Sequence, residues 1–408
     1  MSRAHQPGSR LPFVFILVTL TLDAIGIGLI LPVLPDLLRE VHGGGLASAA
    51  VWGGVLATSF AVMQFLCGPL LGSLSDRFGR RPVLMVSLFV LGLDYLVMAT
   101  ANSIWLLLAA RIVGGIAAAT QATAAAFIAD ISEPGKKSQN FGLIGAAFGI
   151  GFVLGPILGG LLAEFGTRAP FYAAAGLAFV NLAFGAIVLP ETVTDANRRP
   201  FRRGRANPFG ALRHIRRLPQ VSRLLVLFFL YEFAFIVYPA TWAFFTQERY
   251  GWTPASIGLS LAAFGVGMAL VQGGLIRWLI PRFGERATVL YGFAFNFMAF
   301  LVLATVTSGT LAMVFLPLTA FGAVVTPALQ GLMSRRAGAD QQGELQGVIS
   351  SAKALATIVS PLVMTQVFWA FTHPGAATYQ PGAPFFLSAA LMLACAAVFL
   401  AAPRRTMA

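Results

Sequence analysis

Long apolar segments separated by short charged turns constrain this chain more than any other feature of its sequence. The segment at 46–74 is uncharged, and the segment at 83–101 carries only Asp94. A bilayer core of about 30 Å needs about 20 consecutive apolar residues in a helix, and both segments are long enough. Only 11% of the 408 residues are charged, whereas soluble proteins are about a quarter charged. The sequence therefore predicts an all-α integral membrane protein that crosses the bilayer many times.

The apolar segments predict twelve transmembrane helices in two groups of six. We place them at 11–31, 46–75, 82–101, 103–129, 138–163, 169–190, 222–247, 254–281, 286–307, 309–334, 342–371 and 383–402. The first segment is too long for a signal peptide and contains Asp23, so we interpret it as a retained helix. The predicted organisation is an N-terminal six-helix bundle at 1–190, a basic linker at 191–221 and a C-terminal six-helix bundle at 222–408.

Lysine and arginine placement predicts the orientation of these helices. If both termini are cytoplasmic, the predicted outer loops hold only Arg39, Arg168 and Arg249 among the basic residues, and all other loop cations lie inside, as the positive-inside rule requires. Most of the net charge of +13 is thus a signal of topology and does not indicate nucleic acid. The arginine-rich linker lacks interleaved aromatic residues and is expected to attract anionic lipid by about 1 kcal/mol per charge.

The two halves of the chain are related to each other by an internal repeat. Three landmarks recur 205 residues later: Arg77-Phe78-Gly79 as 282–284, Gly142 as Gly347, and Pro156 as Pro361. One offset shared by three separate landmarks indicates duplicated, pseudo-symmetric bundles. Pro281 stands where the first half has Asp76, so the halves share a frame and differ in chemistry. Transporters built from such repeats bind substrate between the halves near the middle of the membrane.

Five charged residues inside the apolar segments form the candidate functional set. They are Asp23, Asp94, Arg111, Glu232 and Lys353. A charge at the bilayer centre costs about 3 kcal/mol or more, so each needs a partner or a water-filled cavity. Counting about 1.5 Å per residue from the predicted helix starts places four of them near one level in mid-membrane. Arg111 enters from outside and is expected to reach the same level.

Charge and depth suggest how these five residues are paired. Glu232 and Lys353 have opposite signs and matching predicted depth, so we expect them to be partners, either as a static ion pair or as a pair opened by protonation or substrate. Arg111 can neutralise only one of Asp23 and Asp94, which leaves the other protonated or reached by water. A desolvated carboxyl of this kind can take up a proton on one side and release it on the other.

Several other classes of protein are disfavoured by the residues that the sequence lacks. The two cysteines lie in apolar segments, and the four histidines share no spacing typical of metal ligands, so we expect no metal site and no resident cofactor. No nucleophile with a nearby base is visible, so we do not expect an enzyme. The absence of a ring of charges argues against a channel, and the buried carboxyl groups argue against a mere scaffold.

The turn at Gly72–Leu84 carries a resemblance to a known family. Its pattern Gly-x-Leu-x-Asp-Arg-x-Gly-Arg-Arg-x-x-Leu resembles the loop signature of the major facilitator superfamily, which joins the second and third helices on the cytoplasmic side. The resemblance implies the twelve-helix fold with alternating access. A second pattern places Gly151, Gly155, Pro156 and Gly159 on the fifth predicted helix. Its spacing predicts close helix packing, and it also resembles the fifth-helix signature of proton antiporters, which favours export.

Four segments resemble the bacterial tetracycline/proton antiporters more narrowly. They are 22–35, 75–84, 93–96 and 327–331. Carried over by position, the resemblance implies that Asp23, Gln64, Asp94 and Arg111 belong to the transport pathway. It likewise implies that Asp76, Arg80 and Asp130 form a cytoplasmic charge cluster that latches the two halves in one state.

The second half departs from that branch. Asn296 and Met268 stand where drug-exporting relatives carry an acidic residue and, in some cases, a histidine. We keep Asn296, Glu232 and Lys353 as pathway candidates, and the departure argues against tetracycline as the substrate.

The leading hypothesis is a proton-coupled exporter of an amphipathic, drug-like compound in the bacterial inner membrane, active as a monomer. Magnesium is expected only as part of a tetracycline substrate. The alternatives are an uptake symporter of the same fold and a receptor or scaffold that transports nothing.

Overall fold

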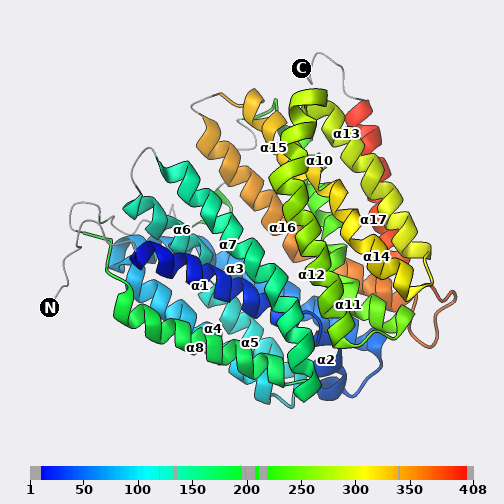
Figure 1. Cartoon of the computed structure of the whole chain (residues 1–408), viewed down its shortest axis with the longest axis horizontal. Helices are drawn as coiled ribbons and strands as arrows, with labels where there is room; N and C mark the ends of the chain where they lie inside the picture. The colour runs from blue at the N-terminus through cyan, green and yellow to red at the C-terminus, as the bar shows by residue number, and fades with distance from the viewer. Residues whose placement is uncertain are drawn as a thin grey trace. The chain divides into compact units, whose positions relative to one another are not determined.

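The computed structural model of the chain describes residues 11–118, 120–132, 136–194, 198, 207–210, 218–338 and 341–401, and all regular structure within them is helical (Figure 1). The first half contains α1 Leu11–Ile30, α2 Leu34–His42, α3 Leu46–Phe78, α4 Arg80–Thr100, α5 Ile104–Ala117, α6 Thr120–Ile131, α7 Lys137–Leu162, η2 Ala163–Phe165 and α8 Ala169–Val188. Most of the predicted basic linker lies outside the described residues.

The second half begins at α10 and repeats this order of long helices. It contains α10 Ser222–Phe235, α11 Val237–Tyr250, α12 Pro254–Leu270, the π-helical turn η4 Val271–Leu275, α13 Ile276–Thr305, α14 Gly309–Thr319, the 3₁₀ turn η5 Ala320–Val324, α15 Val325–Arg336, α16 Gln342–Ala370 and α17 Ala383–Leu400. By contacts, residues up to 37 and 59–208 form one compact unit, and 38–58 with 209 onward form the second. The predicted boundaries at 190 and 222 stay a prediction.

Eleven segments among the described residues are long and apolar enough to cross a membrane. One of them, Pro254–Thr305, runs for 52 residues, more than twice the length that a bilayer needs. Its backbone leaves the helical conformation at Gly284, where φ is 76° and ψ is 163°. A residue with a side chain adopts such a positive φ at a cost, so glycine favours the turn. The predicted total of twelve requires this segment to cross twice, turning at Gly284.

Helix boundaries repeat at the offset found in the sequence. Helix α6 at Thr120–Ile131 corresponds to α15 at Val325–Arg336, which is a shift of 205 residues at both ends. The starts of α5 and α14, the ends of α4 and α13, and the starts of α7 and α16 are related by the same shift. The duplication therefore extends to where individual helices begin and end.

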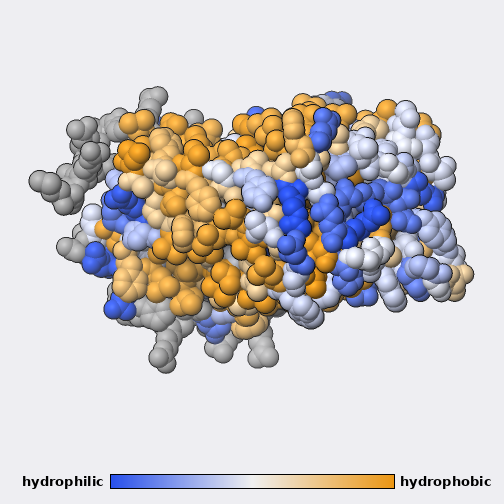
Figure 2. Space-filling model, turned by 90° about the horizontal axis from the view of Figure 1, so that it is seen from below, coloured by the Kyte–Doolittle hydropathy of each residue, from blue (hydrophilic) through white to orange (hydrophobic). Residues whose placement is uncertain are grey.

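The outward faces of the helices are strongly apolar. Trp105, Val180 and Ile187 in the first unit, and Leu270 and Val314 in the second, each expose more than half of their surface. Figure 2 shows broad hydrophobic areas on the surface of the molecule. Contiguous apolar surface on this scale is typical of helices that face lipid.

Glycines let α1 and α7 approach closely, and the two helices run side by side in Figure 1. A Cβ atom at Gly155 would lie 2.7 Å from the Ile25 carbonyl oxygen and 2.8 Å from the Gly28 Cα. Gly151 and Gly159 face α1 in the same way, one turn to either side. The predicted close packing of the fifth transmembrane helix is confirmed, and its partner is the helix that carries Asp23.

Replacing Gly155 with leucine is expected to destabilise the first unit by roughly 1–3 kcal/mol, because the added atoms have no space between α1 and α7. The measurement is the Tm of detergent-solubilised protein. Gly149→Leu is the matched control, because Gly149 lies on the same helix and has nothing within 4 Å of its Cβ position. Equal Tm values for the two variants would contradict the close approach.

Candidate functional site

Asp94 on α4 and Arg111 on α5 form an ion pair inside the first unit. Asp94 is only 3% exposed, so its charge is removed from solvent. The Arg111 guanidinium also lies over the Phe60 ring, 5.2 Å from its centroid. A Cβ atom at Gly114 would lie 2.9 Å from Asp94 Oδ2, so the glycine provides the space that the carboxylate occupies. The sequence left open whether Arg111 pairs with Asp23 or with Asp94, and the structure shows the pair with Asp94.

Asp23 lies half-buried on α1, in a different environment from Asp94. Its carboxyl interacts electrostatically with the buried Tyr95, which follows Asp94 on α4. The Tyr95 ring covers Gly26, where a Cβ atom would lie 2.7 Å from the phenol oxygen. Gln64 lies on α3 with an exposed side chain. Asp94 and Tyr95 are consecutive residues of α4, so the residue next to Asp94 is the one that interacts with Asp23.

The second unit holds a buried polar cluster made from α10, α13, η5 and α15. Thr326 Oγ1 donates a hydrogen bond of 2.8 Å to Glu232 Oε1. Asn296 Nδ2 donates to the carbonyls of Gly292 and Gly322, each at 2.8 Å, and the Tyr231 hydroxyl donates to Gly322 at 3.3 Å. Glu232 is 8% exposed and Asn296 is fully buried. The Gly322 carbonyl in the 3₁₀ turn η5 thus accepts hydrogen bonds from both side chains.

The expected partnership between Glu232 and Lys353 is not formed. The helices are neighbours as predicted, since Ser360 Oγ on α16 donates to the Phe233 carbonyl on α10 at 2.6 Å. That bond puts Ser360, not Lys353, beside Glu232, and Lys353 lies seven residues or about 10 Å nearer the start of α16. The equal-depth argument was wrong because α16 begins about two turns before the level at which α10 begins. Lys353 is exposed.

The predicted cytoplasmic cluster is assembled within the first unit, at the junction of α3, α4 and α6. Arg80 Nη1 lies 2.5 Å from Asp76 Oδ1, and Arg80 Nε lies 3.2 Å from Asp130 Oδ2. Ser75 accepts a further bond from Arg80 at 2.7 Å. Contact among these three charged residues is therefore confirmed, whereas their role as a latch between the two halves stays a prediction.

Glu191, just after α8, is a member of this cluster that the sequence analysis missed. Its carboxylate accepts hydrogen bonds from the backbone N–H groups of Arg80, Arg81, Thr192 and Val193. It therefore caps the start of α4, where the helix dipole favours a negative charge. Gly79 has a φ of 115° and lies against this carboxylate, so both its backbone and its lack of Cβ are required. This role was missed because Glu191 is the first residue of the predicted arginine-rich linker and was not considered as part of the first bundle.

A counterpart of the cluster lies in the second unit with the charges exchanged. Glu285 and Arg335 form an ion pair between α13 and the end of α15. Shifted by 205 residues, Glu285 corresponds to Arg80 and Arg335 to Asp130. Equivalent helices are therefore linked by an ion pair at equivalent positions in each unit. In the first unit the base is on α4 and the acid on α6, whereas in the second the acid is on α13 and the base on α15. Pro281 takes the position of Asp76 and adds no third charge.

The family was decided by comparison with known proteins. A family model described as Major Facilitator Superfamily matches residues 16–361. This chain belongs to the Major Facilitator Superfamily. It is a multi-pass membrane transporter rather than an enzyme.

Individual relatives show which members of the superfamily this transporter resembles. It is 42% identical over 383 residues to the class C tetracycline resistance protein of Escherichia coli, covering 94% of each chain. It is 39% identical to the class G tetracycline resistance protein of Vibrio anguillarum, covering 86% of this chain and 89% of that one. It is also 32% identical to the human major facilitator superfamily domain-containing protein 10, covering 94% and 93%. The resemblance to tetracycline transporters is thus confirmed.

Solved structures show the same fold. The human organic anion transporter MFSD10 (TETRAN) superposes with a TM-score of 0.70 at 29% identity, covering 97% of this chain and 100% of that one. The nucleoside transporter NupG superposes with a TM-score of 0.78 at 13% identity, covering 95% and 98%. The second match shows the fold alone.

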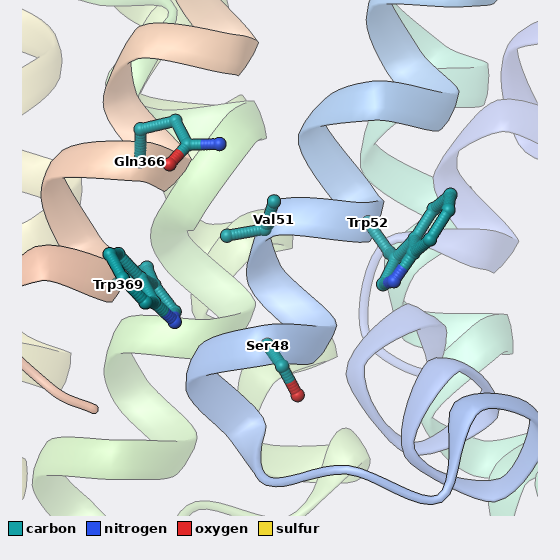
Figure 3. A pocket seen from close by; sticks show the side chains of 5 residues that line it. All are labelled: Ser48, Val51, Trp52, Gln366 and Trp369. Atoms are coloured by element: carbon teal, nitrogen blue, oxygen red, sulfur yellow. The ribbon is translucent and has the colours of Figure 1, made fainter. Parts of the chain in front are cut away.

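A shallow pocket of the transporter lies between α3 and α16 in the second unit. Ser48, Val51, Trp52, Gln366 and Trp369 line it. Figure 3 shows Val51, Gln366 and Trp369 turned toward the space between the helices, with Trp52 on the other side of α3. The lining is neutral and includes none of the predicted pathway residues. In the part of the chain that is described, no group of three or more His, Cys, Asp or Glu residues could hold a metal ion.

Proposed function

We propose that this transporter exports an amphipathic organic compound in exchange for protons across the bacterial cytoplasmic membrane. The observation that carries the proposal is the set of acids in transmembrane helices, of which Asp94 and Glu232 are buried and Asp23 is half-buried. Such groups are costly in a membrane and are retained where ions or substrate pass. We assign Asp23, Gln64, Asp94, Arg111, Glu232, Asn296 and Lys353 to the pathway.

The similarity to tetracycline resistance proteins supports a tetracycline-like drug as substrate. Magnesium would then cross with the drug as its chelate. The described structure also favours a second substrate class, because Lys353 is an exposed cation within a transmembrane helix and could attract an organic anion. The human relative of known structure is named as an organic anion transporter. Both classes are amphipathic, so a substrate panel needs members of each.

The proposal includes three further points about the protein in its membrane. Both termini are cytoplasmic, as the arginine distribution favours. Anionic lipid binds the arginine-rich linker, and the protein acts as a monomer. The cluster of Asp76, Arg80 and Asp130 stabilises one state of the alternating-access cycle.

The test is substrate-driven proton movement in inverted membrane vesicles from a host stripped of its own drug pumps. Adding tetracycline with magnesium, or an organic anion without it, is expected to release protons from vesicles acidified inside. Vesicles without the transporter are the control. Uptake of substrate into intact cells, with no protection of growth, would contradict export and favour the symporter.

A further inference from the structure

Three acids are buried in the membrane-spanning segments of the described structure, Asp94, Glu232 and Glu285, and they differ in how their charge is balanced. Glu285 is paired with Arg335. Asp94 has the guanidinium of Arg111 as its counter-ion. Glu232 has a hydroxyl, that of Thr326, as the partner of its Oε1. A buried carboxylate without a cation is costly, and Glu232 lacks the charge compensation that Arg111 gives to Asp94. The acids are therefore not equivalent carriers of a proton.

No described cation on the neighbouring helices balances Glu232. On α16, Lys353 is exposed and about two turns away. On α15, Arg335 pairs with Glu285, and Arg336 donates to the Gln220 carbonyl. Arg223, at the start of α10 itself, donates to the Val398 carbonyl.

The other titratable groups around Glu232 are neutral at ordinary pH or lie far along their helices. Tyr231 is adjacent and Tyr238 is on α11, both buried. Cys395 on α17 faces the Leu227 carbonyl. Glu248 and Arg249 are at the far end of α11. The surroundings of Glu232 thus consist of neutral groups.

A hydroxyl partner suits an acid that changes its protonation state. Thr326 Oγ1 donates to the carboxylate, as observed, and the same oxygen can accept a hydrogen bond from the protonated acid. An arginine partner cannot do this, because a guanidinium has no acceptor. Asn296 donates to the carbonyls of Gly292 and Gly322, and the Tyr231 hydroxyl donates to Gly322 and also interacts with Thr326. These groups form the polar wall around the bond between Thr326 and Glu232.

We infer that Glu232 carries the coupled proton and that Thr326 is its positioning residue, whereas Asp94–Arg111 is a fixed ion pair. This inference rests on the proposed proton-coupled export. In each cycle a proton from outside adds to the Glu232 carboxylate, forming one O–H bond and cancelling one charge. The same proton then leaves to the cytoplasm and restores the carboxylate. Substrate and proton therefore occupy the second unit in alternate steps of the cycle.

The test compares two transport reactions of Glu232→Gln in vesicles. Substrate counterflow, which exchanges labelled for unlabelled substrate, needs no net proton movement and is expected to stay within about twofold of wild type. Accumulation driven by a pH gradient is expected to fall at least tenfold, because glutamine keeps the size of the side chain and cannot titrate. Glu164→Gln, at an exposed acid of η2, is the matched control and is expected to behave as wild type.

Two further variants keep the inference falsifiable if glutamine impairs folding. Glu232→Asp retains a titratable group and is expected to retain driven accumulation with a displaced pH profile. Thr326→Val is expected to displace the pH profile of driven transport, and Thr326→Ser to restore it.

Three results would overturn the inference. Driven accumulation that survives in Glu232→Gln would remove the proton from this residue. Loss of counterflow in folded Glu232→Gln would make it a substrate ligand instead. A wild-type protein that shows counterflow but no response to a pH gradient would overturn the proposed proton coupling itself.

Discussion

Arg111→Leu is expected to abolish transport and to lower the yield of folded protein sharply. The substitution leaves Asp94, which is 3% exposed, as a buried carboxylate without its counter-ion. Breaking one side of a buried ion pair costs roughly 3–5 kcal/mol. It also removes the guanidinium that lies over Phe60. The measurement is the amount and Tm of monodisperse protein in detergent, with substrate counterflow on the folded fraction.

Neutralising both partners separates the loss of charge balance from the loss of function. Arg111→Leu combined with Asp94→Asn is expected to recover most of the folded protein, because no isolated charge remains, but not transport. Arg277→Leu is the matched control, since Arg277 is exposed on α13. A single Arg111→Leu variant as stable as wild type would show that the ion pair is dispensable.

Glu285→Arg is expected to reduce transport at least tenfold, and adding Arg335→Glu is expected to recover most of it. The single change places two arginines where the structure has an ion pair between α13 and α15. The double change gives the order that already exists 205 residues earlier, where the base is Arg80 on α4 and the acid is Asp130 on α6. The two helix pairs therefore accept either polarity. Counterflow rates of the single and double variants measure the coupling energy.

The corresponding exchange in the first unit gives an internal comparison. Arg80→Glu with Asp130→Arg is expected to recover less, because Arg80 also pairs with Asp76 and a glutamate there would face a second acid. Arg277→Gln, an exposed charge change on α13, is the control for expression. Additive loss in the Glu285 and Arg335 double variant would mean that the ion pair itself does not contribute to transport.

The sequence predicted the fold well because bilayer thickness and arginine placement act on whole segments. The predicted start of the fifth helix at 138 lies one residue from Lys137, and the predicted start at 342 coincides with that of α16. The short α2 was missed because it carries several charges and is too short to span a membrane. The breaks at Ile236 and in η5 were missed because each lies inside an apolar segment that the sequence predicts as one continuous helix. The turn at Gly284 was anticipated by its equivalence to Gly79.

Site residues were predictable where a charge stands in an apolar segment, and not elsewhere. Asp94 with Arg111 follows from charge, although the choice between Asp94 and Asp23 needed the structure. Thr326 and Tyr231 were missed because hydroxyl groups are common in membrane helices and carry no cost that singles them out. Lys353 was misplaced because depth counted from a helix start ignores how far that helix extends beyond its neighbours.

The most direct test of the account is purified protein in liposomes with an imposed pH gradient and no membrane potential. We expect labelled substrate to accumulate on the side with the higher proton concentration, and to redistribute when the gradient is reversed. The accumulation should collapse with a protonophore. Substrate that equilibrates at the same level on both sides, whatever the gradient, would contradict proton-coupled transport by this chain.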